Sequence, residues 1–413
     1  MSLTVRIFVA LVFGLACGFG LAFARPESVP GVTAIADVVG TLWLNGIRMT
    51  VIPLVVALLV SSVASVADAT MLQRVGGRIG RVFLLLIVGI VSFTMTLAVA
   101  VLHWWPPTLV PIRTAGPALA APPPFSQWLT SLVPANPIKA AADGSMLPLI
   151  VFTLLVAFAL LRLPAGRREP VVQLFQSLAD VMMVILQWVL WVAPAGVFAV
   201  SLAMAARQGL AALGALAFYV AMLTGIVAVT TVAVYAVVVF AGGVPLRRFA
   251  AALAPAQTVA GPTLSSLAAL PLMVDAAERQ LGYARATAGL ILPLTVSILR
   301  PSAPVAQIVA TLFTAQWNSI ILSPVDLLTL AVVVTLMSFA TPGVPNGSFV
   351  VMVPVFQSLG LPIDGIGLLL AVDVIPDFAK TILNVTGHMT ALIFIQHAPT
   401  HPDPIAASAV GGG

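Results

Sequence analysis

Long apolar runs dominate this chain, and polar positions are confined to short intervals between them. A transmembrane helix needs about 20 consecutive, mostly apolar residues. The pattern predicts membrane-spanning segments at residues 7–24, 38–66, 82–103, 147–161, 178–205, 212–241, 284–299, 303–316 and 364–395. The two runs between 284 and 316 are short, and Pro301 and Pro304 separate them. The pattern therefore predicts an all-α polytopic membrane protein.

Two further apolar segments, residues 250–276 and 325–359, are interrupted near their middles. The interruptions read Gly-Pro-Thr-Leu-Ser-Ser at 261–266 and Thr-Pro-Gly-Val-Pro-Asn-Gly at 341–347. Re-entrant hairpins tolerate such irregular backbone where it is buried in protein or lines a water-filled cavity. Each segment is followed by another apolar run, and paired broken segments of this kind point to a transporter's binding site near the bilayer midplane.

One apolar run near the C-terminus carries a polar stripe, formed by Asp373, Asp377, Lys380, Asn384 and His388. At about 100° per residue, these positions fall within roughly 80° of arc on one face of a helix. Charged groups inside a membrane are costly unless they face protein or water. The stripe is therefore predicted to be a functional site.

Composition and charge indicate the class of protein and its orientation in the membrane. The chain is 61% hydrophobic and 8% charged, whereas soluble domains are about 25% charged. Four basic residues lie on one side of the predicted membrane: Arg25, Arg113, Lys139 and Arg207. Eleven lie on the other: Arg6, Arg74, Arg78, Arg81, Arg162, Arg167, Arg168, Arg247, Arg248, Arg279 and Arg285. The positive-inside rule makes the second side, with the N-terminus, cytoplasmic. Arg48, Arg300 and Lys380 remain at membrane depth.

Other classes of protein find no support in the sequence. No basic run suits nucleic acid, and Cys17 is the only cysteine, so no disulfide can form within one chain. The patterns HExxH and GxSxG and any Cys/His metal cluster are absent, which argues against an enzyme. Residues 6–24 imitate a secretory signal ending in Ala-Phe-Ala, but they are interpreted as an uncleaved first membrane helix.

Several sequence segments resemble one transporter family. They are residues 265–273 (Ser-Ser-Leu-Ala-Ala-Leu-Pro-Leu-Met), 341–345 (Thr-Pro-Gly-Val-Pro), 377–387 and 47–55, together with Asn136-Pro137 and Leu147-Pro148. In order and spacing they resemble the dicarboxylate/amino acid:cation symporters, the glutamate transporter homologues. The resemblance implies eight transmembrane helices plus two re-entrant helical hairpins with inverted repeats. It also implies a homotrimer in the cell membrane and elevator-type transport.

The resemblance implies that different parts of the chain form different domains. Residues 1–249 would form mainly the scaffold and trimerisation helices, with spans 3 and 6 partly in the moving unit. Residues 250–396 would form the transport core, and residues 397–413 a disordered tail.

The same resemblance assigns roles to the stripe. Asp377 matches the carboxylate that binds a substrate amino group. Lys380 stands where members selective for acidic amino acids carry an arginine, so it keeps the charge but loses the bidentate fork. Thr381 and Asn384 match polar substrate contacts. Two alternatives remain open: Asp377 and Lys380 form a standing ion pair, and Asp373 bonds neighbouring helices rather than substrate.

The predicted hairpins supply the other implied substrate contacts. Ser265 and Ser266 match contacts to the substrate carboxylate, and Thr341 and Val344 match the gate hairpin. The alternative for these hydroxyl groups is local bonding to the backbone.

The chain departs from the family pattern where sodium is expected. The family signature Asn-Met-Asp-Gly-Thr is replaced by Leu-Arg-Pro-Ser-Ala at residues 299–303, so Pro301 stands in place of a sodium-binding carboxylate and His388 in place of a second. Sodium, a hard cation, prefers oxygen ligands, as Ca²⁺ and Mg²⁺ do. The possible coupling region is therefore Arg300, Ser302, Asp373 and His388. Arg300 either places a positive charge near the site of a lost cation, where it could pair with Asp373 or Asp377 or reach the substrate anion, or extends to a water-filled crevice. His388 either carries a coupling proton or stays neutral.

The sequence thus predicts a secondary active symporter for a small anionic solute, an acidic amino acid or a dicarboxylate. It predicts no cofactor other than Na⁺ or H⁺ as the coupling ion. It also predicts that the sodium sites of the family are degenerate in this chain. Its expected partners are the solute, the lipid bilayer and two further copies of the chain. The alternative is a solute-binding or anion-conducting relative without coupled transport.

Overall fold

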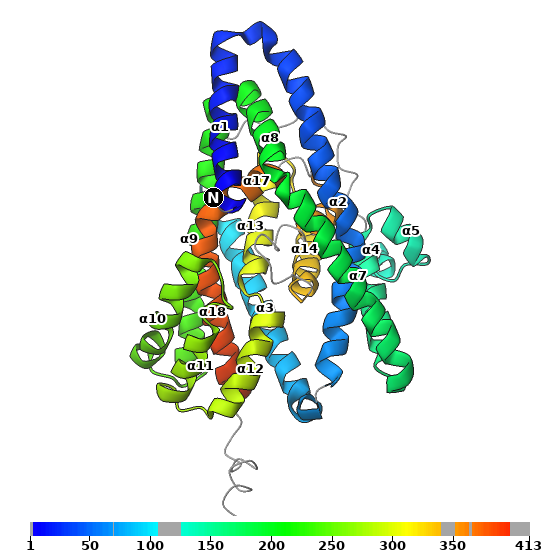
Figure 1. The fold of residues 1–413 in the computed structure, drawn as a ribbon, viewed down its shortest axis with the longest axis vertical. Helices are drawn as coiled ribbons and strands as arrows, with labels where there is room; N and C mark the ends of the chain where they lie inside the picture. The colour runs from blue at the N-terminus through cyan, green and yellow to red at the C-terminus, as the bar shows by residue number, and fades with distance from the viewer. Residues whose placement is uncertain (1–2, 69, 106–124, 340–351, 363–365, 397–413) are drawn as a thin grey trace, which may run out of the picture.

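The computed structural model describes residues 3–68, 70–105, 125–339, 352–362 and 366–396, and every regular element in those ranges is helical (Figure 1). The elements are α1 (Leu3–Ala24), η1 (Pro26–Ser28), α2 (Val29–Asp68), α3 (Thr70–Trp104), α4 (Phe125–Ser131), α5 (Pro137–Ala142), α6 (Met146–Leu160), α7 (Ala165–Trp191), α8 (Ala193–Gln208), α9 (Leu210–Phe240), α10 (Leu246–Thr263), α11 (Leu270–Arg279), α12 (Arg285–Ile298), α13 (Ser302–Trp317), α14 (Pro324–Met337), α16 (Met352–Ser358), α17 (Ile366–Val372) and α18 (Val374–Gln396). The predicted all-helical class is confirmed for these ranges.

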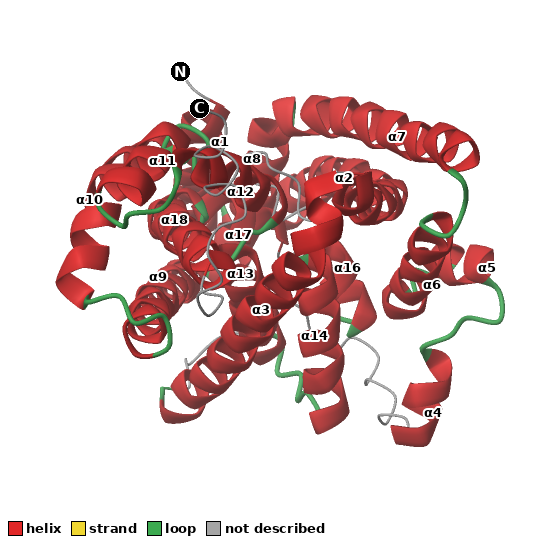
Figure 2. Ribbon diagram, turned by 90° about the horizontal axis from the view of Figure 1, so that it is seen from below, coloured by secondary structure: helices red, strands yellow, loops and turns green. Residues whose placement is uncertain are grey.

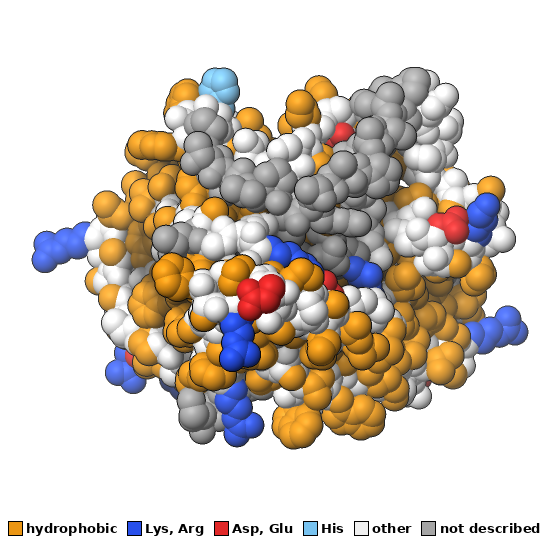
Figure 3. Space-filling view, turned by 90° about the horizontal axis from the view of Figure 1, so that it is seen from above, with side chains coloured by type: hydrophobic (Ala, Val, Ile, Leu, Met, Phe, Trp, Pro, Cys, Tyr) orange, Lys and Arg blue, Asp and Glu red, His pale blue; other side chains and the backbone are white. Residues whose placement is uncertain are grey.

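Apolar helices long enough to cross a membrane account for most of the chain. Within the described ranges there are seven: Val5–Ala24, Pro26–Ser61, Gly77–Trp104, Ala165–Trp191, Leu213–Phe240, Thr287–Trp317 and Val374–Gln396. α6 and α14 are shorter apolar helices. Hydrophobic side chains also cover much of the visible edge in Figure 3. The multi-pass membrane class is therefore confirmed, while eight spans with two re-entrant hairpins stays a prediction.

Two buried helices lie at the centre of the fold. All of α13 is buried except Gln316, and α18 packs on α9, α10, α12 and α3. Away from this centre, α1 packs along α8, and α2 packs along α7 and α8. Figure 2 shows α4, α5 and α6 at the opposite edge from α10 and α11. The stripe-bearing helix α18 is thus surrounded by protein along most of its length.

The expected single span at 178–205 is wrong, because two helices, α7 and α8, meet at Val192. Pro194 lies in the first turn of α8. Proline has no backbone N–H, and its ring clashes with the carbonyl four residues before it. The indole of Trp43 donates to the Val189 carbonyl at 3.2 Å, just before the break.

The expected continuous helix at 364–395 is also wrong in its first part. α17 ends at Val372 and α18 begins at Val374, so Asp373 lies at the junction rather than inside one regular helix. Pro376 explains the break, since it cannot donate to the carbonyl of Val372.

The first interrupted segment, residues 250–276, contains α10 and part of α11, which pack together and are joined by residues 264–269. α10 continues through Gly261 and Pro262 to Thr263, so the turn begins later than expected, at Leu264 with φ 52°. The second segment is seen as α14 and α16, which also pack together. Its centre, with Thr341 and Val344, lies outside the described residues.

Two smaller expectations also meet the structure. The interval between the predicted spans at 82–103 and 147–161, for which no helix was predicted, contains α4 and α5. The tail at 397–413 lies outside the described ranges. The division into scaffold and transport core stays a prediction.

Candidate functional site

The polar stripe is enclosed by protein. Asp373, Lys380 and His388 are 1%, 3% and 1% exposed, and Asn384 is 7% exposed. Because α9, α10 and α12 pack around α18, these groups face neighbouring helices and not hydrocarbon. Protein enclosure is the condition under which ionisable groups persist at membrane depth.

Lys380 lies between two carboxylates. Its ammonium donates to Asp373 Oδ2 and contacts Asp377 Oδ1 at 3.1 Å. The Asp377 side chain remains 24% exposed, whereas that of Asp373 is 1% exposed. The ion pair considered from the sequence is therefore present. The expectation that Asp373 bonds neighbouring helices is corrected, because its recorded bond is to Lys380, two turns along the same segment.

Asp373 also lies near a group that the sequence did not reveal. Its Oδ1 and the hydroxyl of Tyr219 are both buried without a hydrogen-bond partner among the described residues. The charge of Asp373 acts on Tyr219, which is 0% exposed and packs on Phe313 with ring centroids 5.2 Å apart. Buried polar groups are normally paired, so these two atoms are exceptions in the packed interior. In the sequence, Tyr219 could have been noticed as a polar hydroxyl group inside a predicted apolar span.

Arg300 adds a second positive charge. It is half-buried between α12 and α13, and its Nε has no hydrogen-bond partner within the described part of the chain. The charge of Asp377 acts on it. Lys380 thus pairs with both carboxylates, and Arg300 is a second cation on which the charge of Asp377 acts.

The junction between α12 and α13 packs tightly on α18. A Cβ atom at Gly387 would lie 2.3 Å from Pro301 Cγ, so only glycine fits there. Asn384 Oδ1 accepts from the backbone N–H of Ser302 at 2.9 Å. This bond satisfies one of the free N–H groups that begin α13.

His388 lies one turn beyond Asn384. Its Nδ1 has no hydrogen-bond partner in the described ranges, and the charge of Arg300 acts on it. No group of three His, Cys, Asp or Glu side chains able to hold a metal occurs among the described residues. Pro301 offers no side-chain oxygen, so the two positions where the resemblance expects sodium carboxylates lack them here.

The first hairpin approaches the stripe through α10. A Cβ atom at Gly261 would lie 2.6 Å from the Phe378 ring, so the end of α10 lies against the residue next to Asp377. Ser265 Oγ accepts from the Ala268 N–H at 3.3 Å, and Ser266 is half-buried. Thr381 Oγ1 donates to the Asp377 carbonyl at 2.8 Å. The hydrogen bonds of the Ser265 and Thr381 hydroxyl groups are therefore to nearby backbone, which is the alternative considered for the hairpin hydroxyl groups.

Two glutamines, one half-buried and one fully buried, were also missed from the sequence. Gln257 Nε2 donates to the hydroxyls of Tyr235 and Thr386, both at 3.0 Å, and so links α10 to α9 and α18. Gln307 in α13 is 0% exposed, and neither of its amide atoms has a partner among the described residues. Single polar residues within apolar segments were the signal in both cases.

Comparisons with known proteins show the family of the chain. The model of the sodium:dicarboxylate symporter family matches residues 3–398. The proton/glutamate-aspartate symporter of Escherichia coli is 28% identical over 409 residues, covering 95% of this chain and 92% of that protein. The proton/sodium-glutamate symport protein of Bacillus subtilis is 26% identical, covering 96% and 92%. Human neutral amino acid transporter A is 28% identical, covering 87% and 75%. The resemblance drawn from the sequence is confirmed.

Proposed function

The chain belongs to the sodium:dicarboxylate symporter family, a family of transporters rather than enzymes, and from that premise we propose that it carries a small anionic solute, an acidic amino acid or a dicarboxylate. The observation that supports this most is the balanced charge cluster of Asp373, Asp377, Lys380 and Arg300. The four side chains together carry no net charge, and two of them are cations. An anionic solute that binds these cations therefore adds only its own charge to the site.

The contacts suggest how a solute would enter this cluster. Asp377 is the more exposed of the two carboxylates, so a solute ammonium would bind there and take the place of Lys380. The freed lysine, together with Arg300, would bind the solute carboxylates through charge-assisted hydrogen bonds. Asp373 would keep Lys380 oriented. A dicarboxylate without an amino group would use the two cations alone.

The proposal extends to coupling. The side chains of Pro301 and His388 are poor ligands for sodium, which prefers oxygen, and Arg300 places a fixed positive charge beside both Asp377 and His388. We therefore propose that an inward proton gradient, and not sodium, drives uptake. The name of the Escherichia coli relative, a proton symporter, supports this.

The remaining features of the proposal follow from the family resemblance and, for the orientation, from the positive-inside rule. They are eight spans with two re-entrant hairpins, a homotrimer, elevator-type movement of the transport core, and insertion in the cell membrane with a cytoplasmic N-terminus. Cysteine crosslinking between copies and accessibility labelling of residue 6 would test the trimer and the orientation.

Uptake into proteoliposomes tests substrate and coupling together. Radiolabelled glutamate, aspartate and succinate would be supplied with a pH gradient or a sodium gradient imposed separately. We expect accumulation under an inward proton gradient and no response to sodium. Strong sodium dependence with no effect of pH would contradict the proposed coupling, and failure of all three solutes to enter would contradict the substrate class.

Arg300 favours a second candidate, because a fixed cation lets an anion bind with no coupling ion at all. That candidate predicts solute binding or exchange without accumulation under either gradient. Arg300→Gln separates the two: an uncoupled relative loses solute binding, whereas a proton symporter retains pH-driven uptake at reduced affinity. Arg279→Gln is the matched control, since Arg279 is 73% exposed and pairs with Asp275 on the surface.

A further inference from the structure

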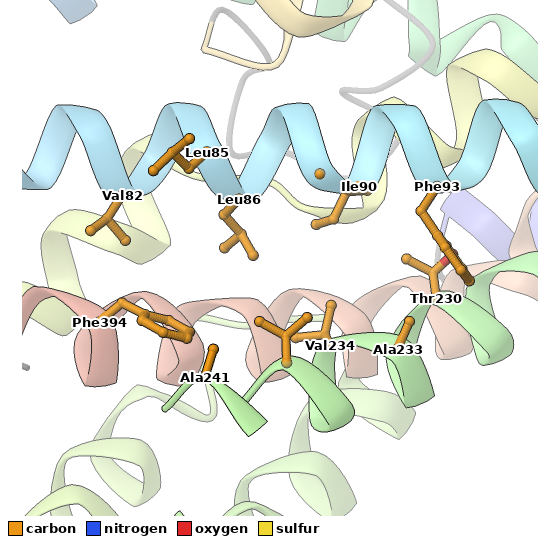
Figure 4. Close-up of a pocket in the computed structure, with 12 residues that line it drawn as sticks. Val82, Leu85, Leu86, Ile90, Phe93, Thr230, Ala233, Val234, Ala241 and Phe394 are labelled. Carbon is orange, nitrogen blue, oxygen red and sulfur yellow. The ribbon is translucent and has the colours of Figure 1, made fainter. Parts of the chain in front are cut away.

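An apolar cavity of about 480 Å³ lies between α3, α9 and the C-terminal end of α18. In Figure 4, Val82, Leu86, Ile90 and Phe93 reach from α3 toward Ala233 and Val234 of α9. Its volume lies within the range of small-molecule sites, about 300–1,000 Å³. Charged side chains are absent from the residues that line it, so the cavity does not suit the anionic solute proposed above.

The cavity opens toward the membrane. Among the residues that line it, Leu85, Phe93 and Val237 are 71%, 39% and 46% exposed. α3 and α9 both contain candidate membrane spans, at Gly77–Trp104 and Leu213–Phe240. Since exposed apolar side chains of a span face hydrocarbon, the entrance to the cavity lies within reach of lipid acyl chains.

One end of the cavity is basic. Arg78 and Arg81 lie one helical turn before Val82 and Leu85, on the same face of α3. Arg78 Nη2 donates to the Phe394 carbonyl at 3.0 Å, which fixes it beside a residue of the cavity wall, and Arg81 is exposed. A guanidinium has five N–H donors, so Arg78 retains donors for a phosphate. The arginine distribution assigns this end to the cytoplasm.

The length of the cavity matches one leaflet. From Val82 to Phe93, α3 rises by about 16 Å, at about 1.5 Å per residue. Half of a bilayer's hydrocarbon core is about 15 Å thick. With Arg78 and Arg81 at the interface, the cavity therefore extends across the cytoplasmic leaflet to about the bilayer midplane.

We propose that this cavity binds an acyl chain of an anionic phospholipid from the cytoplasmic leaflet, and that Arg78 and Arg81 hold its phosphate. Two features favour this occupant. The arginines at one end of the cavity complement an anionic headgroup, and the apolar wall is about as long as one leaflet is thick. The bound chain fills the space between α3 and α9 beside α18, the helix that carries the charge cluster.

Native mass spectrometry of the full-length protein, titrated with phosphatidylglycerol or phosphatidylcholine, tests the cavity. Gly89→Leu fills it from α3, where an added Cβ meets nothing within 4 Å, and Ala233→Leu fills it from α9. Gly225→Leu is the control, because Gly225 lies on α9 with equally open space but does not line the cavity. We expect both filling variants to bind phosphatidylglycerol at least tenfold more weakly, and the control to bind as the wild type does.

The headgroup contacts are tested in the same titrations. Arg78→Gln and Arg81→Gln should each weaken phosphatidylglycerol binding about fivefold, the factor that about 1 kcal/mol per arginine represents. They should weaken phosphatidylcholine binding less, because that lipid carries the same phosphate but no net charge. Equal binding of the two lipids by the wild type would overturn the headgroup assignment. Unchanged binding in both filling variants would overturn the cavity assignment.

A crosslinking measurement keeps the test decisive where a variant fails to fold. Phosphatidylglycerol carrying a photoreactive acyl chain would be crosslinked to the wild-type protein in vesicles. Labelled peptides covering residues 82–93 or 230–241 support the proposal, and labelling confined to other spans overturns it.

Discussion

Two ion-pair sites in this protein use the same chemistry at different depths. The Lys380 cluster is buried, with side-chain exposures of 4% for Lys380 and 1% for Asp373. The pair between Arg207 and Asp37 links α8 to α2, and both side chains are 48% exposed. Water screens the outer pair, so its net contribution is small. The buried charges depend on their protein partners, and loss of one leaves another uncompensated.

The two sites also differ in how completely their atoms are used. Arg207 contacts both carboxylate oxygens of Asp37, one of them at 3.1 Å. Around Lys380, by contrast, Asp373 Oδ1, the Tyr219 hydroxyl and Arg300 Nε have no hydrogen-bond partner among the described residues. A site that serves only stability would be expected to pair these groups. The two sites therefore differ in how many of their polar atoms are hydrogen-bonded within the described residues.

The largest expected effect comes from removing the cation at the centre of the buried cluster. Lys380→Met leaves Asp373 and Asp377 together without their shared partner. We expect a loss of about 3–5 kcal/mol in the free energy of unfolding, the usual cost of breaking a buried pair, and no measurable solute uptake. Thermal unfolding in detergent and proteoliposome uptake would measure the two effects.

Two companion variants separate charge from packing. Lys380→Arg keeps the charge and should retain the fold. Asp373→Asn combined with Lys380→Met removes one carboxylate and should recover part of the lost stability. If Lys380→Met alone were as stable as the wild type, the cluster would not be the coupled unit described above.

An intermediate effect is expected where α18 meets the junction before α13. Gly387→Ala places a Cβ about where Pro301 already lies, at 2.3 Å. Overpacking of this kind costs about 1–3 kcal/mol, and the displaced junction would move Arg300 and weaken solute binding. Thermal unfolding with and without solute would show both changes. Gly225→Ala, which meets nothing within 4 Å, is the control, and equal behaviour of the two variants would argue against the tight contact.

The smallest effect is expected at the outer pair. Arg207→Gln with Asp37→Asn removes both charges and should change the free energy of unfolding by only about 0–1 kcal/mol, with uptake preserved. A double-mutant cycle from the single variants would give the interaction energy. An interaction energy as large as the loss expected for Lys380→Met would contradict the proposed difference between the exposed and the buried ion pair.

The apolar pattern predicted most of the helices, and it failed where local backbone chemistry decides. The runs at 212–241 and 303–316 became α9 and α13 with similar bounds. The breaks at Val192 and Asp373 were missed, because Pro194 and Pro376 lie inside apolar runs that hydropathy reads as continuous. Proline sets helix boundaries by removing a hydrogen-bond donor, which an average over about 20 residues does not detect.

The sequence by itself determined that this is a multi-pass helical membrane protein, and that Asp377, Lys380, Asn384 and His388 share one face of a helix. Helical periodicity and the cost of charge in lipid are enough for both conclusions. Only the tertiary structure decided that Lys380 joins Asp373 to Asp377, and that Arg300 and Tyr219 lie near the same carboxylates. Arg300 and Tyr219 come from parts of the chain that are distant from α18 in the sequence, so packing alone brings them close to it.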